Sequence, residues 1–217
     1  MRGRVLGVVS TLALLVGVVV VYFIFILEEA PPGVAAVVSG ETAQITLQTD
    51  AAYGHNPYPD WVTYMARDPS GTWQHSTILK VPAGTRYVHV TIYQYDTQTG
   101  LRNPFFASVR GTTGGVIDIN GKPVRYVDAA SPAHTFTAPD LNLNVPLPGI
   151  ADDAKNQCSA APCSTSQAHN TISFTIKTPK PGNYRFQCIV PCAAGFLYGF
   201  GGPMQTIGYM DGMIEVA

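Results

Sequence analysis

The sequence predicts an all-β domain, a sandwich or barrel, carried on one N-terminal transmembrane helix. Short strand patterns recur along the chain with turn residues between them, and glycine (21) and proline (17) are plentiful. Long helix-period stretches are absent after the first thirty residues, which themselves contain an unbroken apolar run. A length of 217 residues fits one domain and a tether, or at most two small domains.

The N-terminal run indicates where the chain resides. Residues 5–27 carry no charge, with two arginines before them and two glutamates after them. A membrane span needs roughly 20 apolar residues, and flanking arginines stay in the cytoplasm. We therefore expect residues 1–29 to be a single-pass cell-membrane anchor, 30–42 a stalk and 43–217 an extracytoplasmic domain. A cleaved signal peptide is the alternative, but its apolar region spans about 7–15 residues.

The strand patterns are bounded by recognisable turns. The cleanest alternation is in residues 85–93, where Val88, Val90 and Ile92 share one face. Asn120-Gly121 predicts a two-residue hairpin, and the Pro- and Gly-containing segment 177–182 predicts a second one. The predicted strands are residues 43–49, 85–93, 116–119, 124–127, 171–176, 183–188 and 213–216.

Composition narrows the possible functions. Only 12% of residues are charged and the formal net charge is −1, so no electrostatic footprint for nucleic acid is present. No serine-histidine-aspartate order, phosphate-binding loop or paired-carboxylate motif stands out. The chain is therefore not predicted to hold a hydrolytic or phosphoryl-transfer site of its own.

Four cysteines fall into two pairs. Outside the cytoplasm an even count indicates disulfides, and the short Ser-Ala-Ala-Pro loop between Cys158 and Cys163 predicts a local bridge. Cys188 ends the predicted strand 183–188 and Cys192 follows four residues later, so both sulfurs can face one point. Thiolates and imidazoles suit copper, and a thioether tunes such sites. For this second pair, spacing alone leaves both a disulfide and a metal site open.

Three segments together resemble a known family. Their sequences are Val-Pro-Ala-Gly-Thr at 81–85, Ser-Pro-Ala-His-Thr-Phe-Thr-Ala-Pro-Asp-Leu-Asn-Leu-Asn-Val-Pro-Leu-Pro-Gly at 131–149, and Pro-Gly-Asn-Tyr-Arg-Phe-Gln-Cys at 181–188. In this order they resemble cytochrome c oxidase subunit II, a cupredoxin-like family, in its one-helix form. The resemblance covers residues 81–94, 131–150 and 171–216. It implies a Greek-key β-barrel enlarged by inserts near 95–126, 152–168 and 197–208.

The resemblance also implies a copper site. The family's dinuclear centre takes a histidine, a C-x3-C pair with a carbonyl between the cysteines, a second histidine and a methionine. His134, Cys188 and Cys192 match this pattern, and Val190 or a neighbour corresponds to the carbonyl. Met210 fits the methionine best, because it leads directly into the last strand.

The second histidine of the pattern is missing. Phe196 occupies its position, and no histidine follows His169. His169 is a substitute candidate, because it precedes a strand expected to run antiparallel to residues 183–188. We expect the dinuclear centre to be degenerate, without its purple chromophore. A disulfide between Cys188 and Cys192 is then the competing state of the pair.

These expectations define the functions under consideration. The first is a subunit II-like, electron-entry or non-catalytic component of a haem-copper respiratory terminal oxidase. Its partners would be the large haem-copper subunit, other membrane subunits, and cytochrome c, a blue copper protein or quinol as donor. The alternatives are a free-standing, membrane-anchored mononuclear copper carrier and a structural cupredoxin-like module without metal.

The expected topology is directly testable. Protease added to intact cells or spheroplasts should digest the domain and leave the anchor protected, because the arginine-flanked end faces the cytoplasm. Immunoblots against each end of the chain measure this. Release of the whole domain without detergent, with a new N-terminus near residue 30, would instead demonstrate cleavage.

Overall fold

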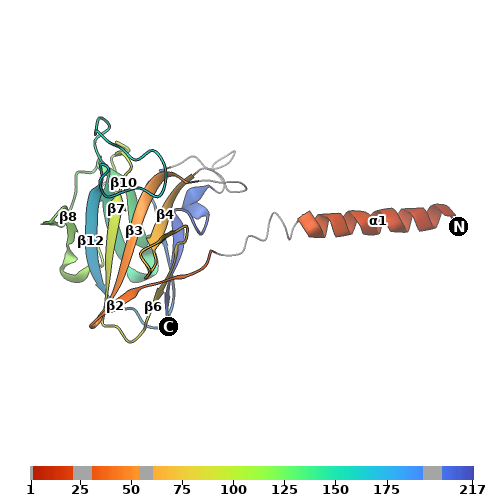
Figure 1. Ribbon diagram of the computed structural model, residues 1–217, viewed down its shortest axis with the longest axis horizontal. Helices are drawn as coiled ribbons and strands as arrows, with labels where there is room; N and C mark the ends of the chain where they lie inside the picture. Colours follow the sequence, from red (N-terminus) through yellow and green to blue (C-terminus); the bar gives the residue numbers. More distant parts are fainter. Residues whose placement is uncertain (1, 22–30, 54–60, 193–201) are drawn as a thin grey trace. The chain divides into compact units, whose positions relative to one another are not determined.

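The computed structural model describes residues 2–21, 31–53, 61–192 and 202–217. The chain divides into two compact units, residues 1–30 and 31–217. The first contains helix α1 (Arg2–Val21) (Figure 1). Within the described residues, no helix has both the length and the apolar character needed to cross a membrane. Residues 22–27 of the apolar run lie outside the described part.

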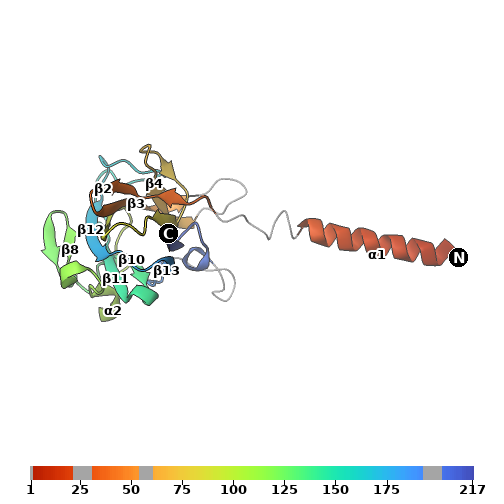
Figure 2. The ribbon, with the colours of Figure 1, turned by 90° about the horizontal axis from the view of Figure 1, so that it is seen from below.

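The second unit is an all-β sandwich whose two sheets appear as facing layers in Figures 1 and 2. Most neighbouring strands are antiparallel; the pairs β1–β6, β6–β14 and β3–β7 are parallel. Sheet A has the order β1 (Val34–Ala35), β6 (Ile78–Val81), β14 (Asp211–Val216), β13 (Gly182–Gln187), β10 (Pro132–Ala138) and β11 (Leu143–Pro148). Sheet B has the order β5 (Trp73–Gln74), β4 (Trp61–Arg67), β3 (Thr42–Tyr53), β7 (Tyr87–Gln94), β12 (Asn170–Lys177), β8 (Ile117–Ile119) and β9 (Lys122–Val124), with β2 (Val37–Ser39) paired to β3.

Short helices occupy the connections. They are α2 (Pro104–Ala107), η2 (Thr113–Gly115), η3 (Pro139–Leu141) and η5 (Pro203–Gln205). The segment 95–126, expected as an insert, contains α2, η2, β8 and β9. The segment expected as a stalk, residues 30–42, is partly strand, because β1 pairs with β6 and β2 pairs with β3. Two- and three-residue strands are too short to leave a periodic signal.

The alternating segments are strands, as predicted. In β7 the side chains of Val88, Val90 and Ile92 are buried and their neighbours are half-buried. Asn120 and Gly121 both have positive φ (53° and 81°), as a type I′ hairpin requires. The second strand of this hairpin begins earlier than the predicted residues 124–127. It is β9, which starts directly after Gly121 because a two-residue turn leaves no residues between turn and strand.

The predicted hairpin at 177–182 is wrong. β12 pairs with β7 and β8 in sheet B, whereas β13 pairs with β14 and β10 in sheet A. The Pro-rich connection therefore crosses between the layers. β10 and β11 were also missed as strands. Every residue in them is buried, but both contain proline (Pro132 in β10, Pro146 and Pro148 in β11), which argues against a strand when only the sequence is read.

Aromatic side chains join the two sheets. Phe136 of β10 stacks on Phe186 of β13 with ring centroids 4.3 Å apart. From sheet B, Phe174 lies 5.6 Å from the Phe136 ring, and Tyr64 approaches both phenylalanines edge-on at 6.1 and 5.8 Å. Such contacts add about 0.5–1.5 kcal/mol per pair beyond the area that they bury. This four-ring cluster fixes the spacing of the layers.

Gly212 supplies a test of the packing. A β-carbon there would lie within 3.0 Å of the Thr77 carbonyl oxygen and the Phe186 ring, neither of which is free to retreat. We expect Gly212→Ala to lower the free energy of unfolding by about 1–3 kcal/mol. Gly84→Ala is the matched control, because no atom lies within 4 Å of its added carbon. Urea denaturation measures both, and equal losses would contradict this packing argument.

Candidate metal centre

His134, Cys188 and Cys192 meet at one end of the sandwich. One ligand atom from each lies within 4.8 Å of the others. The two sulfurs are 3.5 Å apart, and the Cys188 sulfur is 3.8 Å from His134 Nδ1. His134 and Cys188 are buried and Cys192 is half-buried. The structure thus brings together the two cysteines that spacing indicated and the histidine that the family resemblance added to them.

Strand periodicity explains why these ligand atoms converge. His134 lies two residues before Phe136, and Cys188 lies two residues after Phe186. Because side chains two apart share a face of a strand, each ligand points into the same layer as its aromatic neighbour. The stacked phenylalanines therefore hold β10 and β13 at the distance that makes His134 and Cys188 neighbours.

Backbone contacts fix the loop that carries the cysteines. The Cys188 amide donates to the Met210 carbonyl oxygen at 2.8 Å, and the Ile189 amide donates to Thr135 Oγ1 at 3.0 Å. The Val190 carbonyl oxygen lies 3.4 Å from the Cys188 sulfur, as the resemblance implied for a carbonyl in this loop. Met210 is fully buried. Its backbone thus borders the centre, and its thioether remains a candidate ligand.

A carboxylate supports the histidine. Asp96, just beyond the end of β7, accepts from His134 Nε2 at 2.6 Å. Burial on its own would lower the pKa of His134, but hydrogen bonds and charge from Asp96 and Cys188 raise it to about 10. The imidazole is thus held as a cation beside the cysteines when no metal is bound.

The two thiols have opposite acidities. Burial favours the neutral thiol of Cys188, yet hydrogen bonds from Cys192 and His134 outweigh it and hold its pKa well below the usual range. The hydrogen bond to Cys188, followed by burial, raises the pKa of Cys192. One thiolate and one thiol therefore share a proton beside the imidazolium. Both cysteines are free, and their 3.5 Å separation far exceeds a bond of about 2.05 Å, so the disulfide considered for this pair is not formed.

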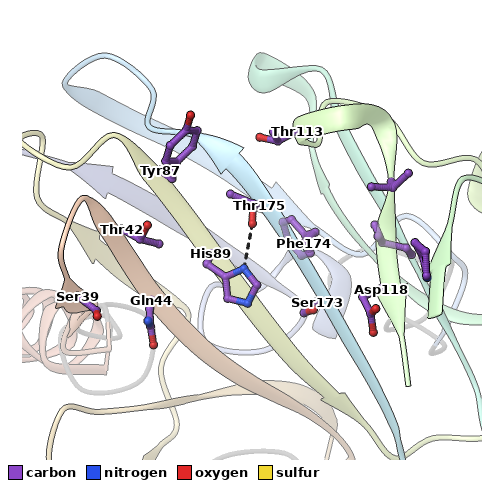
Figure 3. Close-up of a pocket in the computed structure, with 13 residues that line it drawn as sticks. Ser39, Thr42, Gln44, Tyr87, His89, Thr113, Asp118, Ser173, Phe174 and Thr175 are labelled. Carbon is purple, nitrogen blue, oxygen red and sulfur yellow. Dashed lines mark hydrogen bonds between the residues drawn. The ribbon is translucent and has the colours of Figure 1, made fainter. Parts of the chain in front are cut away.

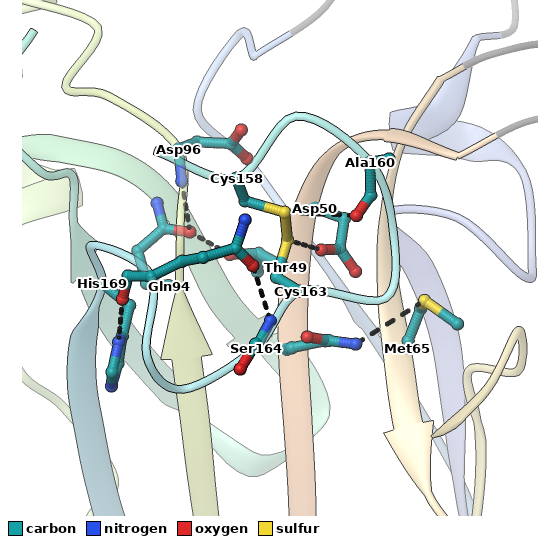
Figure 4. The surroundings of a disulfide bond; sticks show 12 residues. Thr49, Asp50, Met65, Gln94, Asp96, Cys158, Ala160, Cys163, Ser164 and His169 are labelled. Carbon is teal, nitrogen blue, oxygen red and sulfur yellow. Dashed lines mark hydrogen bonds between the residues drawn. A yellow bond between two sulfur atoms is a disulfide. The ribbon is translucent and has the colours of Figure 1, made fainter. Parts of the chain in front are cut away.

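The other predicted disulfide is confirmed, between Cys158 and Cys163. It closes a ring within the loop 151–169, and the Cys163 sulfur lies against Asp50, a buried carboxylate at the end of sheet B (Figure 4). Burial and the negative charge of Asp96 raise the pKa of Asp50 to about 7, although the Cys163 backbone opposes the shift. Asp50 therefore carries a proton in acid and loses it near neutrality.

His169 is not part of the cluster of His134 and the two cysteines. Its ring lies 5.5 Å from that of Tyr93 and 5.3 Å from that of Tyr95, and its Nδ1 is 2.8 Å from the Gln167 carbonyl oxygen. Its expected role as a substitute ligand assumed that β12 runs beside β13, whereas the two strands belong to different sheets. Phe196 and residues 197–201 of the last insert lie outside the described residues.

Sequence reasoning missed Asp96. It follows the alternating strand β7, and this strand ends where β12 begins, since Gln94 pairs with Asn170. The available signal was therefore positional: a carboxylate placed just after a strand that ends near the cysteines. This signal could not be used from the sequence alone. The residue pattern of a strand in one sheet does not show which residues of the other sheet lie beside its end.

Two cavities bear on the choice of site. A cavity of about 290 Å³ is lined by His134, Cys192, Asp96 and Val62 together with Ala133 and residues 97–99, so the centre is accessible from solvent through the half-buried Cys192. A larger groove of about 550 Å³ lies on the outer face of sheet B (Figure 3). There His89 Nδ1 lies 2.9 Å from Thr175 Oγ1 among hydroxyl and amide side chains. Of these two, only the smaller cavity contains converging soft donors.

Comparisons with known proteins gave few matches. No family model matches the chain, and no curated protein does. Two single-substitution variants of rusticyanin are similar at 17% and 16% identity, covering 88% of this chain and 84% and 86% of theirs, each with a TM-score of 0.32. The metal-binding domain of a Cu(I)-exporting P-type ATPase from Streptococcus pneumoniae D39, with Cu(I), is similar at 10% identity, covering 87% of this chain and 99% of that one, with a TM-score of 0.37. Likenesses with TM-scores this low support no argument about the function of this chain.

The raised pKa of Asp50 predicts how stability depends on pH. The folded protein binds this proton more tightly than the unfolded chain, so the stabilisation is complete below about pH 4 and is lost as pH rises through about 7. The full effect is roughly 4 kcal/mol at most. The free energy of unfolding, measured with urea, should therefore decrease less between pH 4 and pH 8.5 for Asp50→Asn than for the native chain. The same dependence of the free energy of unfolding on pH in both proteins would contradict the raised pKa of Asp50, because all other groups titrate alike in the two.

Proposed function

We propose that this protein is a cupredoxin-like, subunit II-type component of a haem-copper terminal oxidase, carrying one copper ion on His134, Cys188 and Cys192. The observation that supports it most is the arrangement of these three donors, with two unbonded sulfurs 3.5 Å apart and an imidazole nitrogen 3.8 Å from one of them. In this proposal residues 1–29 anchor the chain in the cell membrane and residues 43–217 lie outside the cytoplasm.

The donor set fits a soft ion. Thiolates and imidazole are the ligands that copper prefers, and Cys188 is already held as a thiolate. The described residues provide one imidazole at this point, whereas the family's dinuclear centre needs one for each metal. One ion therefore suits the site better than two.

A bound copper ion would supply one-electron chemistry by cycling between Cu(I) and Cu(II). The chain's residues prepare for it. Cys192 must release its proton on binding, and His134 must lose the proton from Nδ1, so affinity rises with pH. The rigid strands behind His134 and Cys188 keep the donors in place, which limits the rearrangement that accompanies electron transfer.

A free-standing copper carrier is the second candidate. Cys192 is half-buried and lines the solvent-facing cavity, so an ion bound there is accessible to exchange. Isolation from native membranes in mild detergent separates the two functions. Co-purification with a haem-containing large subunit supports the oxidase component, and isolation of the chain alone with copper supports the carrier.

The copper content is the central measurement. Full-length protein purified under reducing conditions and titrated with copper(I) against a chromophoric chelator should bind one equivalent. We expect Cys188→Ser, Cys192→Ser and His134→Ala each to lower copper(I) affinity at least tenfold, since each removes a ligand. Cys158→Ser/Cys163→Ser is the matched control, because it removes a sulfur pair bonded at a separate place.

The oxidised protein distinguishes the alternatives. One copper without a seven-line electron paramagnetic resonance spectrum agrees with the proposal. Two coppers per chain with that spectrum would contradict it, as would unchanged affinity in the cysteine variants. An intact, metal-free protein with a Cys188–Cys192 bridge under all conditions would favour the purely structural module.

A further inference from the structure

We infer that Asp96 is a positioning residue for the metal ligand His134, holding the imidazole so that Nδ1 faces Cys188 and Cys192. The inference rests on the proposed copper site and extends it to a residue outside the family's ligand pattern. The juxtaposition that carries it is direct: Asp96 Oδ2 lies 2.6 Å from His134 Nε2, and the opposite ring nitrogen lies 3.8 Å from the Cys188 sulfur.

The contact with Asp96 determines the orientation of the ring. His134 is 3% exposed, so a nitrogen without a partner would be costly there. Rotating the ring by half a turn would put carbon atoms toward both the carboxylate and the sulfurs. The hydrogen bond from Nε2 therefore reserves Nδ1 for the metal, because a neutral imidazole that keeps its proton on Nε2 has its lone pair on Nδ1.

Asp96 is itself fixed by the neighbouring backbone. Its carbonyl oxygen accepts from the Ile150 amide at 3.0 Å, and the Gln98 amide donates to the Ile150 carbonyl at 3.3 Å. Gly149 permits this approach: a β-carbon there would lie within 3.0 Å of the backbone of Thr97 and Gln98. The loop that carries Asp96 is thus held against residues 149–150, which follow β11, the strand paired with β10.

The charge of Asp96 also matches this role. A carboxylate that accepts from a ligating histidine raises the basicity of that ligand and fixes its tautomer, and loss of such a partner typically costs 10- to 100-fold in metal affinity. Asp50 is a buried carboxylate close to Asp96, but its contact is with Cys163. The two aspartates differ in what they touch, and this difference supplies a control.

The test is a double-mutant cycle in the full-length chain, with copper(I) as the probe and a chromophoric chelator as competitor. We expect Asp96→Ala to weaken copper(I) binding 10- to 100-fold, and Asp50→Asn to leave it within about twofold. In a His134→Ala background Asp96→Ala should have no further effect, because Asp96 acts through the imidazole. Asp96→Asn, which preserves the side-chain volume, serves if the alanine variant fails to fold, and should also weaken binding at least tenfold.

A spectroscopic readout separates positioning from general destabilisation. With cobalt(II) in place of copper, loss of the imidazole ligand changes the visible absorption bands, and we expect Asp96→Ala to resemble His134→Ala in them. Additive losses in the cycle, or native affinity and native bands in both Asp96 variants, would overturn the role of Asp96 alone. Absence of copper(I) binding by the native chain would overturn the proposed site and this inference with it.

Discussion

The stacking of Phe136 on Phe186 is the contact on which the rest of the candidate centre depends. It joins β10 to β13 within one sheet, and the rings of Phe174 and Tyr64 lock that pair to the other sheet. Each phenylalanine lies two residues from a candidate ligand on the same strand face. The Tyr64 hydroxyl also donates to the Thr135 carbonyl at 2.8 Å, directly beside His134. The spacing of His134 and Cys188 is therefore set by the core, whereas Cys192 is placed by the loop that follows β13.

Above this core lies a small buried polar network whose charges compensate one another. The carboxylate of Asp96 is paired with His134, and His134 in turn faces the thiolate of Cys188. Each charged group in the network therefore has a neighbour of opposite charge. Low surrounding polarity strengthens such pairs and makes an unpaired member expensive. A metal cation that binds between the sulfurs displaces the protons of Cys192 and His134 Nδ1. The negatively charged donors that remain are already in place around it. In the same arrangement the two sulfurs share one proton as thiol and thiolate.

The sequence predicted those features that have a local cause. Alternation located β7 and β12, Asn120-Gly121 located its hairpin, and the short loop between Cys158 and Cys163 located the disulfide. Pairing between distant strands has no such local signal. For this reason β12 was wrongly placed beside β13, His169 was brought toward the cysteines, and Asp96 was overlooked. Cys188 and Cys192 were found from their spacing, and the family resemblance connected His134 to them by supplying the long-range information that periodicity lacks.

The position of β14 has a consequence for how the protein is made. This strand, residues 211–216, lies between β6 and β13, so sheet A is divided until it is added. Because a ribosome delivers the chain in order, β13 emerges with Cys188 and Cys192 before β14, one of the two sheet neighbours of β13, has been made. Contacts of such long sequence separation form slowly, and partly folded chains expose their interiors meanwhile. During that interval Cys188, which is fully buried in the folded protein, is open to oxidants and to stray metals.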